Sequence, residues 1–264
     1  MKPKKRIGIF DSGVGGLTVL AELHALMPQA DYVFIGDSAN NPYGNRSPQN
    51  LEYLAKNMIR FLLRQKVDVM VIACNTLSVM LHRYCDSFAA AFIPITIPII
   101  GEIAAMSLER IGLLGTVATV NSGVYQRNIQ AANPAIEVIG EGCPLLAGRI
   151  DAGRLDAKTI NAEIRKHMDN LLRQQADLRH VILGCTHYPL VMDNFRKLYP
   201  DIVFIDPARN QAMATREYLS TGKFRETGQG SLTICSTGKT EIFEFFLRRL
   251  GIWPVDELLQ VTLS

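Results

Sequence analysis

The sequence predicts an α/β protein built from mainly parallel sheets that helices cover on both faces. Short runs of β-branched and apolar residues recur along the chain, and longer amphipathic stretches separate them. The runs are apolar almost throughout, as expected for strands that are buried on both faces of a parallel sheet. Strands that alternate regularly with helices form parallel α/β architectures.

Eight runs are predicted to be strands. They are residues 6–10, 31–36, 67–73, 111–115, 136–140, 180–184, 201–206 and 232–236. Two of the intervening stretches, residues 47–66 and 156–175, carry apolar side chains at helical spacing. The first of these begins with Ser47, a favourable N-cap, followed by Pro48 at the first helical position.

Prolines interrupt this alternation in "FIPITIPIIG", and a second interruption is "DPARN". We expect the chain to pass between two lobes there, with residues 1–96 plus 208–264 in the first lobe and 97–207 in the second. The stretches "DVMVIACNT" and "RHVILGCTH" each lead an apolar strand into a cysteine and polar residues, which indicates two similar lobes. Because ligands of open α/β sheets bind beyond the strand ends, the active site is predicted in the cleft between the lobes.

Charge and hydropathy exclude several classes of protein. The net charge is +3, from 28 basic and 25 acidic side chains, which is too near balance for a nucleic-acid or membrane-surface binder. The basic N-terminus runs into "IGIF" and an aspartate, so no signal peptide is predicted. The longest apolar run contains two prolines and is too short to span a bilayer. We therefore expect a cytoplasmic protein.

Cys74 and Cys185 are the two cysteines for which a function is predicted. Each follows a predicted strand and precedes side chains that form hydrogen bonds: Asn75 and Thr76 after the first, Thr186 and His187 after the second. Two thiols from equivalent elements of two lobes would face one another across a cleft. The remaining thiols, Cys85, Cys143 and Cys235, are predicted to be structural, and no C-x-x-C pair suggests a disulfide framework.

Two facing thiols without a metal suit either a redox pair or proton transfer at carbon from opposite sides. Racemising an amino acid requires a base to remove the Cα proton and an acid to supply one to the other face. A thiolate/thiol couple is accessible near neutral pH. Because the α-proton is very weakly acidic, such a site must be closed, dry and preorganised, and the closure of two lobes provides this.

The stretch "IFDSGVGGLTVLAEL" forms a glycine turn from a strand into a helix. A dinucleotide fingerprint would need glycine at position 18, which is Thr18, so nucleotide binding is disfavoured. The turn instead offers backbone N–H donors for a substrate carboxylate, with Asp11 facing an amino group or a neighbouring thiol. The polar loop "DSANNPYGNRS" reaches the same edge of the sheet and brings Tyr43 and the Gly44 amide as candidate ligands.

His187 lies two residues after Cys185. As an imidazolium or a hydrogen-bond donor it would stabilise the thiolate of Cys185 or act as an acid. The other histidines form no ligand-spaced set with the cysteines, so no metal site is predicted.

Four motifs, in order over nearly the whole chain, together resemble the bacterial glutamate racemases of the aspartate/glutamate racemase superfamily. They are "FDSGVGGLTVL", "NPYGNRS", "ACNTLS" and "LGCTHYPL". The resemblance implies the interconversion of L- and D-glutamate for peptidoglycan synthesis, without pyridoxal phosphate or another cofactor. It also implies two α/β lobes with the active site between them.

The resemblance further assigns roles residue by residue. Cys74 corresponds to the base for D-glutamate and Cys185 to the base for L-glutamate, while Asp11 and His187 match the residues that assist them. The implied substrate-binding residues are Asp11, Ser12, Tyr43, Gly44, Asn75, Thr76, Thr116, Thr119, Thr186 and His187. Two positions depart from the pattern: Asp151 stands where many members have glutamate, and Ala118 where glycine is expected.

Two other functions are compatible with the sequence. One is a racemase of the same superfamily that acts on aspartate or another amino acid. The other is a non-catalytic thiol-redox or ligand-binding protein that uses the same cleft. The helical surfaces are compatible with a homodimer, but no residue pattern singles out an interface.

Overall fold

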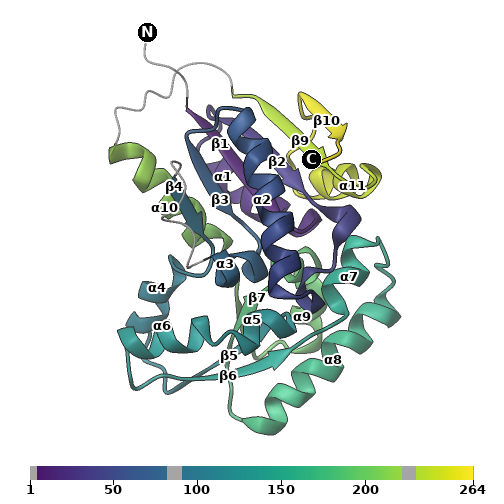
Figure 1. Cartoon of the computed structure of the whole chain (residues 1–264). Helices are drawn as coiled ribbons and strands as arrows, with labels where there is room; N and C mark the ends of the chain where they lie inside the picture. Colours follow the sequence, from purple (N-terminus) through teal and green to yellow (C-terminus); the bar gives the residue numbers. More distant parts are fainter. Residues whose placement is uncertain (1–4, 82–90, 222–229, 264) are drawn as a thin grey trace.

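The computed structural model describes residues 5–81, 91–221 and 230–263. It contains two parallel sheets, of six and four strands, with helices on both faces of each, as the sequence predicts. In Figure 1 the six-stranded sheet occupies the upper part of the molecule and holds both ends of the chain in purple and yellow. The four-stranded sheet lies below it in teal and green.

The six-stranded sheet has the order β10-β9-β2-β1-β3-β4. Its strands are β1 (Arg6–Asp11), β2 (Asp31–Gly36), β3 (Val69–Ile72), β4 (Ala91–Pro94), β9 (Leu232–Ser236) and β10 (Glu257–Gln260). The helices of this part are α1 (Leu17–Leu26), α2 (Pro48–Arg64), α3 (Asn75–Leu81), α10 (Ala208–Thr221) and α11 (Glu241–Arg249). Apolar side chains of α2 pack on one face of the sheet, and those of α1, α10 and α11 pack on the other.

The four-stranded sheet has the order β6-β5-β7-β8. Its strands are β5 (Arg110–Gly115), β6 (Glu137–Gly142), β7 (His180–Gly184) and β8 (Val203–Ile205). The helices here are α4 (Ile99–Ala105), α5 (Val117–Asn121), α6 (Val124–Ala132), α7 (Leu146–Asp151), α8 (Ala157–Gln174) and α9 (Met192–Leu198). Helices α4 and α6 cover one face, while α8 and α9 cover the other.

All eight predicted strands are present, with ends that differ by up to two residues. The N-cap prediction for α2 is also confirmed, since the Ser47 side chain accepts a hydrogen bond from the Asn50 N–H at 3.3 Å. β4 and β10 were not predicted. We keep the division into residues 1–96 plus 208–264 and residues 97–207 as our proposal for the two lobes, and call them the first and the second lobe.

Parallel pairing brings the carboxyl ends of the strands together at one edge of each sheet. In the first lobe Asp11 pairs with Gly36, and Phe10 with Ile72, so the loops after β1, β2 and β3 leave side by side. In the second lobe Gly115 pairs with Gly184, which places the loops after β5 and β7 together. The functional residues predicted from the sequence lie at these strand ends, in the loops that follow or in the first turns of the next helices.

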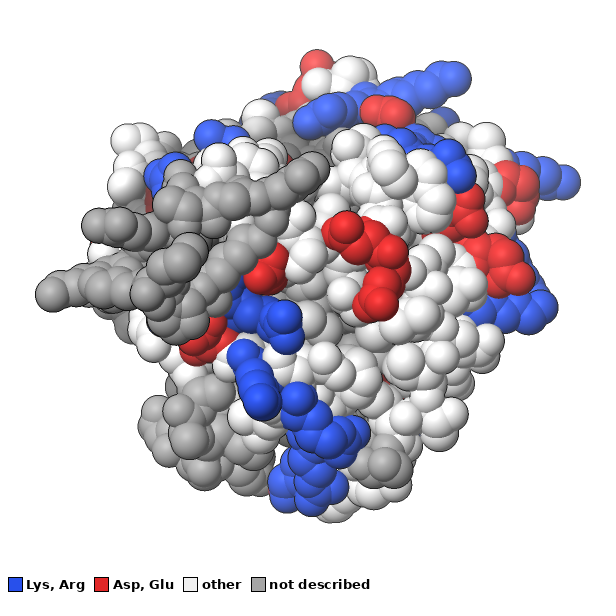
Figure 2. All heavy atoms as spheres, turned by 90° about the horizontal axis from the view of Figure 1, so that it is seen from above, with Lys and Arg blue, Asp and Glu red and all other residues white. Residues whose placement is uncertain are grey.

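The surface carries both signs of charge. On the face shown in Figure 2, Lys and Arg side chains lie among Asp and Glu side chains, in keeping with the small net charge. Among the described helices, none is long and apolar enough to cross a membrane.

Candidate active site

A narrow cavity lies between the two lobes. The first lobe contributes Ser12, Asn41, Pro42, Tyr43, Gly44, Cys74, Asn75 and Thr76. The second lobe contributes Thr116, Cys143, Pro144, Ala147, Cys185, Thr186 and His187. Eight of the ten predicted substrate-binding residues therefore line one cavity, together with both predicted catalytic cysteines. The other two, Asp11 and Thr119, lie directly behind lining residues.

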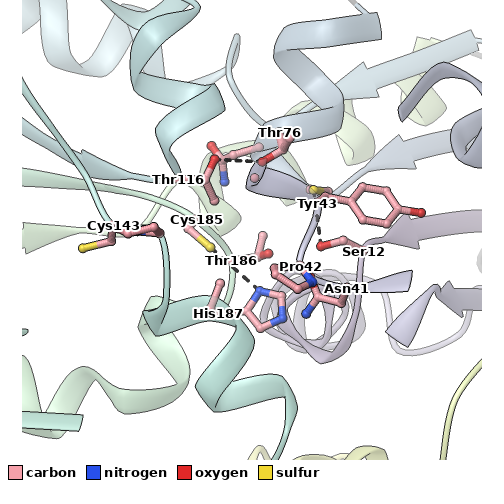
Figure 3. A pocket seen from close by; sticks show the side chains of 15 residues that line it. Ser12, Asn41, Pro42, Tyr43, Thr76, Thr116, Cys143, Cys185, Thr186 and His187 are labelled. Carbon is pink, nitrogen blue, oxygen red and sulfur yellow. Dashed lines mark hydrogen bonds between the residues drawn. The ribbon is translucent and has the colours of Figure 1, made fainter. Parts of the chain in front are cut away.

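Both cysteines reach this cavity from the ends of strands, as predicted. Cys74 follows β3 and Cys185 follows β7, and each is 5% exposed, so the two thiols are sheltered from bulk water. Cys74 and Cys185 come from different lobes, and both line this cavity. Figure 3 shows Cys185 on one side of the view and Ser12 and Tyr43 on the other, with His187 and Asn41 close together below them.

Asp11 organises the Cys74 side of the cavity. Its carboxylate accepts hydrogen bonds from the Gly13 N–H at 3.0 Å, the Ser12 hydroxyl at 3.3 Å and the Thr186 hydroxyl at 3.0 Å. The last of these bonds joins the two lobes. The Cys74 thiol in turn donates to Ser12 Oγ at 3.6 Å. The Asp11 carboxylate therefore contacts Thr186 directly and reaches the Cys74 thiol through the Ser12 hydroxyl.

Burial raises the pKa values of the Cys74 thiol and the Asp11 carboxyl group. Burial raises the pKa of the Cys74 thiol to about 12, and the negative charge of Asp11 acts in the same direction. Burial also raises the pKa of Asp11, against the lowering effect of His187 and of its hydrogen bonds. In the free protein Cys74 is thus a protonated thiol at neutral pH, ready to act as an acid.

His187 organises the Cys185 side. Its Nδ1 lies 3.8 Å from Cys185 Sγ, and its Nε2 lies 3.2 Å from Asp151 Oδ1. Burial alone would lower the pKa of His187, but the hydrogen bonds and charges of Asp151 and Cys185 outweigh it and raise the pKa well above its usual value. The imidazole is therefore a cation at neutral pH, and its Nδ1 is within hydrogen-bonding distance of Cys185 Sγ.

Asp151 is the carboxylate that stands in place of the family's glutamate. It lies at the end of α7 and accepts hydrogen bonds from the Val14 N–H at 2.8 Å and from His187. Burial raises the pKa of Asp151, but the His187 hydrogen bond and charge outweigh it, so the pKa is lowered. A Cβ on Gly13 would overlap the Asp151 carboxylate, which explains the glycine at that position.

These bonds correct one expectation about the glycine turn. The backbone N–H groups of this turn were expected to be donors for a substrate carboxylate. Those of Gly13 and Val14 instead donate to Asp11 and Asp151 within the protein. These two N–H groups therefore fix two protein carboxylates in place.

Three threonines form a chain of hydroxyl contacts across the lobes. Thr76 Oγ1 lies 2.9 Å from Thr116 Oγ1, which lies 2.9 Å from Thr119 Oγ1. Thr119 supports Thr116 from behind and does not line the cavity itself. Tyr43 is likewise held from behind, because its hydroxyl donates to the buried Asp37 carboxylate.

Several lining residues were missed from the sequence. Asn41 and Pro42 lie in the loop where only Tyr43 and Gly44 were chosen, and Ala147 had no polar group to attract notice. Cys143, predicted to be structural, also lines the cavity, but its thiol points away from Cys185 (Figure 3). Cys85 lies outside the described residues, and within the described ranges no group of three His, Cys, Asp or Glu side chains is arranged to hold a metal ion.

Comparison with known proteins identifies the family. The sequence matches the Asp/Glu/hydantoin racemase family over residues 18–215. The chain belongs to this family. The resemblance inferred from the four motifs is thereby confirmed.

Relatives of the family match nearly the whole chain. A glutamate racemase of Carboxydothermus hydrogenoformans is 36% identical over 259 residues, covering 93% of this chain and 90% of its own length. The structure of the Francisella tularensis glutamate racemase in complex with D-glutamate has a TM-score of 0.88 and 27% identity, covering 99% of this chain and 98% of that one. The Thermus thermophilus glutamate racemase in complex with β-chloro-D-alanine has a TM-score of 0.83 and 32% identity, with the same coverage.

Proposed function

We infer that this chain is a glutamate racemase, an isomerase that interconverts L- and D-glutamate. The single observation that carries the inference is the placement of Cys74 and Cys185, one from each lobe, on one closed cavity. The full-length relatives named as glutamate racemases support the choice of substrate. D-Glutamate made in this way would supply peptidoglycan synthesis in the cytoplasm.

The proposed reaction moves one proton on each face of Cα. For L-glutamate, the Cys185 thiolate takes the Cα proton and the Cys74 thiol gives its proton to the opposite face. The turnover leaves Cys185 protonated and Cys74 as the thiolate, which is the state that acts on D-glutamate in reverse. Burial of both sulfurs keeps water from quenching the carbanion-like state.

The surrounding charges fit an amino-acid substrate. The Asp11 carboxylate lies behind Ser12 on the Cys74 side, where it would compensate the substrate ammonium group. The cationic His187 would compensate negative charge that develops near Cys185. Among the described lining residues there is no Lys or Arg, so the donors for the two carboxylates would be neutral groups or the His187 imidazolium.

The decisive assay is the circular dichroism of L-glutamate incubated with the protein alone. We expect the signal to decay to zero, and treatment with hydroxylamine, which removes pyridoxal phosphate, should leave the rate unchanged. Decay of the signal with L-aspartate but not with L-glutamate would show that the substrate is aspartate rather than glutamate. No decay with any amino acid would contradict catalysis and favour a thiol-redox or ligand-binding protein.

A further inference from the structure

Tyr125 joins the two lobes at the active site without lining the cavity. It lies on α6 of the second lobe and is completely buried. Its hydroxyl donates a hydrogen bond of 2.7 Å to Asn75 Oδ1. Asn75 begins α3 of the first lobe, directly after Cys74. The bond therefore reaches the reacting thiol's neighbour from the opposite lobe.

The side-chain amide of Asn75 has a hydrogen-bond partner for its oxygen but none for its nitrogen among the described residues. Its side chain lines the cavity, the residue is 2% exposed, and its Oδ1 accepts the Tyr125 hydroxyl. Its Nδ2 is buried and has no hydrogen-bond partner among the described residues. A buried donor is normally paired, so an unpaired one at a cavity indicates an acceptor brought by a ligand.

The acceptor that fits best is a carboxylate of the substrate. Glutamate carries two carboxylates, and the described lining residues include no Lys or Arg to bind them. An amide N–H donor binds a carboxylate by a charge-assisted hydrogen bond, which is stronger than a neutral one. In a closed cavity of low dielectric this bond gains further strength.

The orientation of this amide depends on Tyr125. An asparagine amide can rotate by half a turn and exchange its oxygen and nitrogen with little change in shape. The exchanged amide would turn Oδ1 toward the substrate carboxylate and repel it. Burial, with the charges of Asp206 and Cys185, raises the pKa of the Tyr125 hydroxyl, so it stays protonated and can donate at every physiological pH.

We propose that Tyr125 is a positioning residue: by donating to Asn75 Oδ1, it aims Asn75 Nδ2 at a carboxylate of the bound amino acid. The proposal rests on the proposed racemase function. Tyr125 and Asn75 belong to different lobes and meet only when the lobes are together. The orientation of the Asn75 amide toward the substrate therefore depends on closure of the two lobes.

The test is the variant Tyr125→Phe, which removes only the hydroxyl. We expect KM for L- and D-glutamate to rise about tenfold, with kcat within about threefold of the wild type, because the lost contact binds the substrate rather than the transition state alone. The same substitution is then made in an Asn75→Ala background. There it should change KM by less than about twofold, since the amide it positions is absent.

Each outcome of this cycle decides the proposal. If Tyr125→Phe raises KM by the same factor with and without Asn75, its role is general support of the fold, and the proposal is wrong. An unchanged KM in the single variant also contradicts it. Tyr32→Phe is the matched control: that buried hydroxyl donates to the backbone oxygens of Leu23 and Met27, so its loss should lower thermal stability and leave KM unchanged.

Failure of the proposed function gives a different result. If the wild type racemises no amino acid, the proposed racemase function is wrong, and this is known before the variants are compared. If it racemises aspartate instead, the same cycle is run with aspartate, which also carries two carboxylates. The inference about Tyr125 fails only when an active wild type and its Tyr125→Phe variant share the same KM, or when the cycle is additive.

Discussion

Replacing either Cys74 or Cys185 by alanine lowers kcat/KM for glutamate by about 10⁴-fold, because each variant lacks the acid or base on one face of Cα. The two enantiomers have equal free energies, so the equilibrium constant is one. The loss in kcat/KM must therefore be the same for L- and D-glutamate in each variant. Decay of the circular dichroism signal measures both directions.

Cys235→Ala is the matched control for these variants. Cys235 lies in β9, is 2% exposed and does not line the cavity, so its substitution deletes a buried thiol without touching the site. We expect its kcat/KM to stay within about twofold of the wild type. Near wild-type activity in either Cys74→Ala or Cys185→Ala would contradict the two-base scheme.

Asp151→Asn is expected to lower kcat/KM about 10- to 100-fold near pH 8 and to change the pH profile. The Asp151 hydrogen bond and charge help to raise the pKa of His187, and the imidazolium is lost as pH rises through that pKa. Removing the charge lowers this pKa. In the pH profile of kcat/KM, the fall in activity at alkaline pH should therefore begin at lower pH. The fall in activity at acid pH should keep its position.

The asparagine variant preserves shape, since its side-chain oxygen can still accept from the Val14 N–H. Asp193→Asn serves as the control, because that carboxylate is exposed and pairs with Arg249 at the surface at 3.5 Å. Its alkaline limb should not move. Superimposable pH profiles for Asp151→Asn and the wild type would show that Asp151 does not control His187.

The residues predicted best from the sequence are those at strand ends. Cys74 and Cys185 were found because an apolar strand that leads into a thiol and polar residues places its end at the ligand-binding edge of a parallel sheet. This rule depends only on neighbouring residues. The resemblance then added Thr116 and Thr119, which have no local signal of their own.

The contacts missed from the sequence depend on the docking of the two lobes. Asp151 meets Val14, and Tyr125 meets Asn75, across this boundary. No spacing in the sequence encodes these contacts. The same reason explains why the backbone donors of the glycine turn were expected to face the substrate, whereas two of them bind protein carboxylates.

The two missed strands are both edge strands. β4 and β10 close the ends of the six-stranded sheet. β4 ends at Pro94, which an edge strand tolerates but which interrupts the sequence pattern of a strand. β10 is largely exposed, so it lacks the continuous apolar run by which the buried strands were recognised.

The most direct test of two bases on opposite faces is racemisation of L-glutamate in deuterated water, stopped at low conversion. Mass spectrometry of the separated enantiomers then measures deuterium at Cα. We expect D-glutamate to carry one solvent deuterium, delivered from Cys74, while the remaining L-glutamate is unlabelled because Cys185 only removes its proton. Early deuterium in both enantiomers alike, or D-glutamate that keeps the original proton, would contradict the two-base mechanism.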